Sequence, residues 1–119
     1  MPTVSPAGFR YFRELYTRGQ LTITNAEVVV SGLRISASAS ILSVNTAAGS
    51  GYEDLIVDFV ITFNTSVAGT LQEISITVSG PSLKGVTPVI HFCSSEDLTV
   101  PAGTVRVTKR FIVRWYTRT

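Results

Sequence analysis

Apolar and polar residues alternate with a period of two along most of the chain from Leu21 onward. Such alternation is typical of β-strands that bury one face and leave the other in water. The segment 55–64 shows it most clearly, with an apolar face made of Leu55, Val57, Phe59, Ile61 and Phe63. The pattern recurs in LTITNAEVVV, LRISASASILSV, LQEISITVSG and GTVRVTKRFIVRWYT. The chain is therefore predicted to fold mainly as β-sheet.

One segment, at about residues 6–18, has the periodicity of a helix instead. Phe9, Phe12 and Leu15 recur at helical spacing, which predicts one apolar stripe. Ser5 and Pro6 suit the start of a helix, and Gly19 suits its end. We expect a short extended arm at residues 1–4, followed by a helix that packs on the sheet.

Turn residues divide the β-rich part into segments. Ser31–Gly32 predicts a turn or a bulge, and the small residues of Asn45–Gly51 and Gly80–Gly85 predict two loops. Pro88 lies inside VTPVIHFCSS, which places that segment at a sheet edge or a bulge. EDLTVPAG is expected to cross over to the closing strand.

The length of 119 residues fits a single domain spanning residues 1–119. Apolar residues make up 45% of the chain and charged residues 15%, a balance that predicts a folded core rather than disorder. Short strands after one leading helix predict a β-sandwich or a small barrel with the helix packed alongside. The expected core, beside the helix stripe, comprises Leu55, Val57, Phe59, Ile61, Phe63, Ile74, Ile76, Val78, Phe111, Val113 and Trp115.

No catalytic or metal motif is evident in the sequence. His91 and Cys93 share one face of a predicted strand, but no orienting acid or oxyanion loop accompanies them. One histidine and one cysteine cannot supply the four ligands of a structural zinc site. The acids near Glu53 and Glu96 lack the spacing of a calcium loop. We therefore expect a non-enzymatic protein without a cofactor or a metal, and a buried, structural Cys93.

The closing strand carries a row of positive charge. Arg106, Arg110, Arg114 and Arg118, with the neighbouring Tyr116, are the candidate site residues. They could bind phosphates of a nucleic acid, or pair with acids such as Glu53, Asp54 and Asp58, or with acids of another subunit. Arginine suits such pairing, and a net charge of +2 is small for nucleic-acid binding, so pairing is preferred.

One residue of the closing strand breaks its pattern. Strict alternation would point Lys109 toward the core, together with Val107 and Phe111. Either the strand bulges at Lys109–Arg110, or the lysine side chain snorkels past an edge of the core.

The opening residues MPTVSPAG resemble no export signal, and no apolar run is long enough for a membrane span. The sequence predicts synthesis in a cytoplasm and no membrane partner.

The order of elements resembles that of short β-rich virion proteins of tailed phages and related viruses, such as tail-fibre-like modules and head-decoration proteins. The resemblance covers GTLQEISITVSG, the closing TPVIHFCSSEDLTVPAGTVRVTKRFIVRW and, more loosely, the opening helix. It is a similarity of element order and turn style. The arginine-rich closing strand departs from these modules, which commonly end on neutral Thr and Val.

This resemblance implies a virion structural protein made in a host cytoplasm, which assembles with itself, as a trimer by family analogy, and with other virion proteins. Long, nearly uncharged strands such as LTITNAEVVV also favour pairing with another chain. We expect contacts from the N-terminal arm, Ala26–Ser43 and the closing strand. The alternatives are a pilin-like or adhesin-like filament subunit that uses strand addition, and a nucleic-acid-binding module that uses the arginine row.

Overall fold

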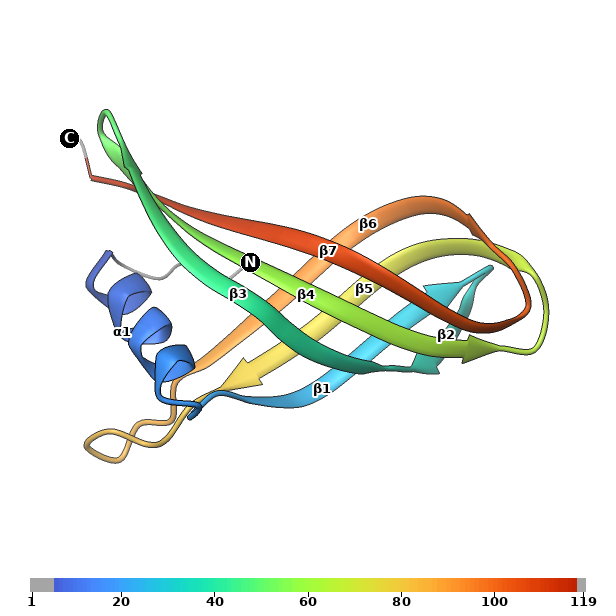
Figure 1. Cartoon of the computed structure of the whole chain (residues 1–119), viewed down its shortest axis with the longest axis horizontal. Helices are drawn as coiled ribbons and strands as arrows, with labels where there is room; N and C mark the ends of the chain where they lie inside the picture. The colour runs from blue at the N-terminus through green and yellow to red at the C-terminus, as the bar shows by residue number, and fades with distance from the viewer. Residues whose placement is uncertain (1–5, 118–119) are drawn as a thin grey trace.

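The computed structural model describes residues 6–117, in which one helix is followed by seven strands (Figure 1). The elements are α1 (Pro6–Thr17), β1 (Thr22–Val30), β2 (Leu33–Ser36), β3 (Ser38–Gly49), β4 (Tyr52–Thr65), β5 (Gly69–Ser79), β6 (Val89–Val100) and β7 (Gly103–Tyr116). The predicted N-terminal arm and Arg118 lie outside the described residues.

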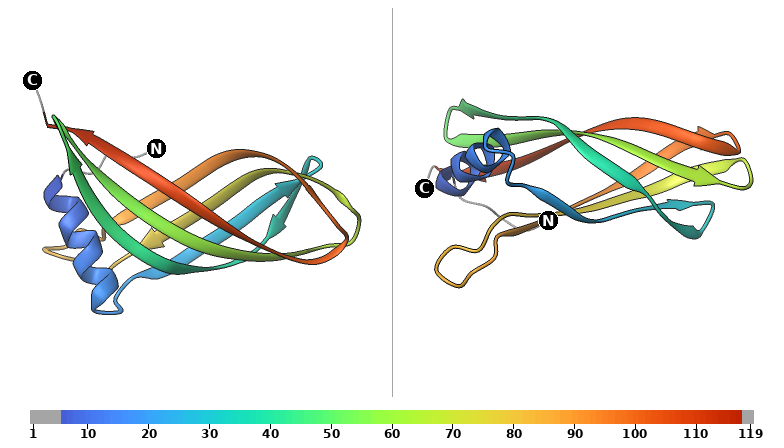
Figure 2. Two further views of the ribbon diagram at one scale, coloured as in Figure 1. Left: turned by 45° about the horizontal axis from the view of Figure 1, so that its top comes forward. Right: turned by 60° about the horizontal axis from the view of Figure 1, so that its bottom comes forward.

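The strands form two antiparallel sheets that face each other as a sandwich. The four-stranded sheet has the order β2-β1-β5-β6, and the three-stranded sheet has the order β3-β4-β7. Figure 2 shows the two layers, with α1 across one end of them. The chain passes between the sheets three times, from β2 to β3, from β4 to β5 and from β6 to β7. The predicted β-sandwich is therefore confirmed, and the sheets do not close into a barrel.

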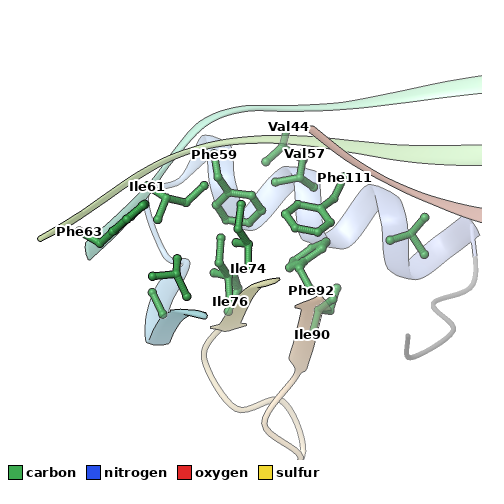
Figure 3. Packing of buried hydrophobic residues seen from close by; sticks show 14 of the residues in the cluster. Val44, Val57, Phe59, Ile61, Phe63, Ile74, Ile76, Ile90, Phe92 and Phe111 are labelled. Carbon is green, nitrogen blue, oxygen red and sulfur yellow. The ribbon is translucent and has the colours of Figure 1, made fainter. Parts of the chain in front are cut away.

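The core lies between the two sheets and follows the predicted alternation. All five apolar residues of the predicted β4 face are at most 3% exposed. Beside β4 in the same sheet, β7 contributes Phe111 and Val113, and across the core β5 contributes Ile74, Ile76 and Val78, all of them buried. Figure 3 shows Phe59 and Phe111 on one side of this core and Ile74 and Ile76 on the other. Trp115 is half-buried and packs against this cluster. The inward faces of β4, β5 and β7 were thus correctly predicted from the period of two.

The helix α1 packs its apolar stripe onto the end of the sandwich. Phe9, Phe12 and Leu15 are buried, as predicted. The helix ends at Thr17, and Gly19 just after it has a φ of 69°. The Gln20 amide donates to the Leu15 carbonyl at 2.9 Å, and the Gly19 amide donates to the Tyr16 carbonyl at 3.0 Å. These two bonds form a Schellman C-cap, which satisfies carbonyls at the helix end.

The segment LRISASASILSV is not one strand of one sheet, as the sequence suggested. It bends at Ala37, so that β2 pairs with β1 in one sheet and β3 pairs with β4 in the other. The Ala37 amide donates to the Ala26 carbonyl at 2.9 Å and holds this corner. Corners of this kind occur where a strand passes from one sheet of a sandwich to the other. The predicted turn at Ser31–Gly32 is confirmed as the β1–β2 hairpin.

The predicted loop at Asn45–Gly51 is wrong. Residues 45–49 continue β3 and pair with β4, and only the turn at Ser50–Gly51 is irregular. At Gly49 the lack of a side chain is needed for packing, because a Cβ there would fall 2.0 Å from the ring of Tyr52, its cross-strand partner. Gly51 has a φ of 82°, which glycine adopts without strain.

The region around β6 partly matches the expectation. Pro88 directly precedes β6, which is an edge strand of its sheet, as its proline predicted. However, β6 extends to Val100 and includes most of EDLTVPAG, so the crossover to β7 is shorter than expected. The loop at Gly80–Gly85 is confirmed, with a bridge between Leu83 and Val86.

Candidate interaction surface

The arginine row lies on the outer face of the three-stranded sheet, where β7 is an edge strand. Arg106, Arg110 and Arg114 are each exposed and point away from the core, as the alternation of β7 requires. Tyr116 follows them and is 72% exposed. Each arginine is placed opposite one residue of β4, and the identity of that residue decides what the arginine can do.

Arg110 lies directly opposite Asp58 on β4. Its Nε and Nη2 donate to the two carboxylate oxygens at 2.8 and 3.1 Å, and the Ser43 hydroxyl donates to the same carboxylate at 3.0 Å. The guanidinium lowers the pKa of Asp58, and the Ser43 hydrogen bond lowers it further. This bidentate geometry fixes the arginine in one orientation.

Arg114 lies opposite Asp54 in the same way. Its Nε and Nη2 donate to the Asp54 carboxylate at 2.7 and 2.9 Å, and its guanidinium stacks 3.8 Å above the centre of the Tyr52 ring. The hydrogen bonds to Asp54 raise the pKa of Arg114. Asp54 is itself buried, at 7% exposed. Its bidentate pair with Arg114 therefore forms part of the packed surface of the sheet.

Arg106 differs because Thr62 lies opposite it. Within residues 6–117 it has no ion-pair partner. The predicted pairing of the row with acids is thus confirmed for Asp54 and Asp58 and does not extend to Glu53. That carboxylate instead accepts a hydrogen bond from Arg10 of α1 at 3.3 Å. Of the three described arginines in the row, Arg110 and Arg114 are neutralised by acids of β4, and Arg106 has no ion-pair partner within residues 6–117.

Lys109 does not bulge out of β7, because the β4–β7 register is continuous through it. The lysine points inward, and its Nζ lies 2.9 Å from a carboxylate oxygen of Glu96 on β6. The snorkelling alternative is therefore confirmed, and the salt bridge joins the edges of the two sheets. Inward-pointing charges are one way in which proteins protect a sheet edge from pairing with other chains.

The opposite side of the sandwich has no such protection. There the free edge of β1 at residues 22–25 faces the free edge of β3 at residues 38–41, across a groove. The groove consists of two adjoining hollows of about 460 and 380 Å³. Neither edge segment carries a charged side chain. At the helix end of the groove, the Tyr16 hydroxyl donates to the Leu42 carbonyl of β3 at 3.0 Å.

The outer face of the four-stranded sheet carries a hydrogen-bonded polar network. His91 contacts the hydroxyls of Ser75 and Thr77 through its two ring nitrogens, at 3.2 and 2.7 Å. Cys93 is exposed rather than buried, which corrects the prediction of a buried thiol. Local desolvation and the nearby Glu73 carboxylate raise the pKa of this thiol, which makes it a poorer nucleophile. Among the residues that the structure describes, neither imidazole nitrogen bonds a carboxylate, as a catalytic triad would require.

An apolar pocket, partly open to solvent, lies between α1 and the adjacent ends of β5 and β6. It has a volume of about 160 Å³ and is lined mainly by apolar side chains, including Phe12, Leu15 and Ile90. A binding site for a small polar substrate needs a few convergent polar groups, and this pocket offers none of charge. We interpret this pocket as a packing gap between the helix and the sheet.

Two further properties of the described residues bear on function. Residues 6–117 contain no cluster of three or more His, Cys, Asp or Glu side chains arranged to hold a metal ion. Among the helices that the structure describes, none is long and apolar enough to cross a membrane. Comparison with known protein families, curated proteins and solved structures finds no match for this chain.

Sequence reasoning missed three features of this surface: the stacking of Arg114 on Tyr52, the Lys109–Glu96 bridge and the groove between β1 and β3. The first two depend on which residues lie opposite each other across strands or sheets, and periodicity within one strand does not contain that information. The signal for the groove was present, because the same uncharged residues had suggested an open edge.

Proposed function

We propose that this chain is a non-enzymatic structural protein of a virus particle, either a capsid decoration, a fibre-like module or another tail component. It would act by self-association and by contacts with other virion proteins, after synthesis in the host cytoplasm. The observation that carries the proposal is the uncharged, open strand edge beside the β1–β3 groove. An edge of this kind is a template for pairing with another chain, and it differs from the charged edges on the other side of the molecule.

The distribution of charge supports contact with protein rather than with nucleic acid. Asp58 and Asp54 neutralise Arg110 and Arg114 through bidentate hydrogen bonds. Phosphate binding would have to break these bonds or tolerate the nearby carboxylates. Arg106 alone, on a chain with a net charge of +2, gives a small electrostatic contribution to phosphate binding.

A filament subunit that uses strand addition is the second candidate, because the same open edge favours it. Electron microscopy of the purified protein separates these classes. Discrete rings, or particles of uniform size, support a virion component, and long fibres of one chain favour the filament subunit. Binding to DNA or RNA at micromolar concentration and physiological salt, weakening steeply as salt rises, would contradict both and favour the nucleic-acid module.

A further inference from the structure

We propose that two copies of this chain pair through the edge of β3, antiparallel and across a two-fold axis at Ser40, to make one continuous six-stranded sheet. This inference rests on the proposed function, since it specifies how self-association begins. The partner is a second copy of the same chain. The segment that pairs is centred on Ser40 and stops short of the Leu42 carbonyl, which already accepts a hydrogen bond from the Tyr16 hydroxyl.

The charge of the four sheet edges selects β3. The edges on one side, β6 and β7, carry acids and bases, including Glu96, Asp97, Arg106 and Lys109. Pairing either of these edges with itself would juxtapose like charges or disturb the inward salt bridge. The strand β2 has only four residues and carries Arg34. By contrast, β3 has twelve residues and none is charged, so it can lie beside its own copy without repulsion.

The position of the open edges determines the symmetry. The uncovered segments of β1 and β3 lie on the same side of the sandwich, because the chain passes from β2 to β3 there. Two copies that use this side must therefore meet through identical surfaces. Such an isologous contact has two-fold symmetry. It gives a dimer or another even-numbered assembly, whereas the resemblance to virion modules implies a trimer.

The alternation of β3 determines the register. A two-fold axis through Ser40 keeps the outward side chains of both copies on the same face, because opposite residues of antiparallel strands share a face. It sets Ile41 of one copy opposite Ala39 of its partner on the inner face, a large residue against a small one. Leu42, which is 50% exposed at the β-bulge of β3, then lies opposite Ser38 of the partner, at the end of the paired segment.

Charge substitution at the axis tests the pairing. Ser40→Lys would set two lysines opposite each other, and we expect the dissociation constant of the dimer to rise by about tenfold or more, because juxtaposed like charges strongly oppose an interface. The matched control is Thr108→Lys. Ser40 and Thr108 both lie opposite Val60, in one row of the sheet, but Thr108 is on the far edge, β7. The Thr108→Lys control should therefore leave the dissociation constant of the dimer unchanged.

Mixing chains that carry opposite charges at residue 40 separates loss of pairing from loss of folding, because association that returns on mixing cannot come from a folding defect. Ser40→Lys and Ser40→Glu chains should each sediment mainly as monomers and should associate when mixed, provided that circular dichroism shows both to be folded. A dimer that persists in Ser40→Lys, equal weakening by Thr108→Lys, or an odd-numbered oligomer would overturn the β3 pairing and leave the proposed function standing. A wild-type monomer at high micromolar concentration would overturn both.

Discussion

Three phenylalanine rings from three strands meet at the centre of the core. Phe59 and Phe92 have ring centres 5.2 Å apart, Phe59 and Phe111 are 5.7 Å apart, and Phe92 and Phe111 are 5.3 Å apart. The first two pairs are edge-to-face, a favourable geometry for aromatic rings. These residues connect the two sheets, because Phe92 comes from the four-stranded sheet and the others from the three-stranded sheet.

Truncating this cluster should strongly destabilise the fold. We expect Phe59→Ala or Phe111→Ala to lower the free energy of unfolding by about 3–5 kcal/mol, since each change leaves a cavity in a buried site. Urea titration of each variant measures this loss. Ile112→Ala is the control, because Ile112 is exposed on the other face of β7. A loss below about 1 kcal/mol at both phenylalanines would contradict their central place in the core.

The Arg110–Asp58 pair makes stability depend on pH. Because the pKa of Asp58 is lower in the folded chain than in the unfolded chain, the pair stabilises fully above the unfolded value of about 4. This contribution is lost as the pH falls through the folded pKa. Asp58→Asn should therefore destabilise the protein at pH 7 and cost progressively less below pH about 4. Thermal unfolding at several pH values tests this, and a cost independent of pH would contradict the role of the charge.

Among the elements, β6 and β7 illustrate how a sheet edge is protected. Glu96 and Lys109 are partly buried, and their 2.9 Å salt bridge spans the two sheets. Glu96→Val alone should destabilise the protein, since it leaves Lys109 inward without its partner. The double change Glu96→Val with Lys109→Val should restore much of the stability and promote association through this edge, visible as additional larger species in size-exclusion chromatography. A double variant with unchanged elution would contradict the protective role.

The elements also show what the sequence could and could not predict. Alternation determined the inward faces of β4, β5 and β7, because a period of two depends only on one strand. The corner at Ala37 was not predictable in this way, since the residues alternate without interruption through it and only their partners change. The loop at Asn45–Gly51 was wrongly predicted for another reason. Its small residues suit a loop, yet residues 45–49 continue β3, and Gly49 leaves room for the ring of Tyr52.

For the candidate site, the sequence predicted the exposed arginines but not which of them are neutralised. That outcome follows from the cross-strand register, which sets Asp58 and Asp54 opposite Arg110 and Arg114, and Thr62 opposite Arg106. The register depends on the β4–β7 pairing of distant segments. Arg118 lies outside the described residues, so its role stays a prediction.

At the scale of the whole molecule, the two sides of the sandwich have opposite character. One side carries charged edges joined by a salt bridge, and the other carries uncharged edges on either side of a groove. In a monomer, among the residues that the structure describes, only the Leu42 carbonyl at the helix end of the groove gains a side-chain partner, the Tyr16 hydroxyl, and the uncharged strand edges stay open. We therefore predict that the open side is covered by another copy of the chain.

Light scattering on the protein eluting from a size-exclusion column tests this claim most directly. At high micromolar concentration we expect a mass that is a multiple of the 12.8 kDa chain and falls toward the monomer on dilution. The far side, with its charged edges, should stay unpaired, so the assembly should be finite rather than fibrous. A single species of 12.8 kDa across the whole concentration range, with no rings or fibres under the electron microscope, would contradict the account.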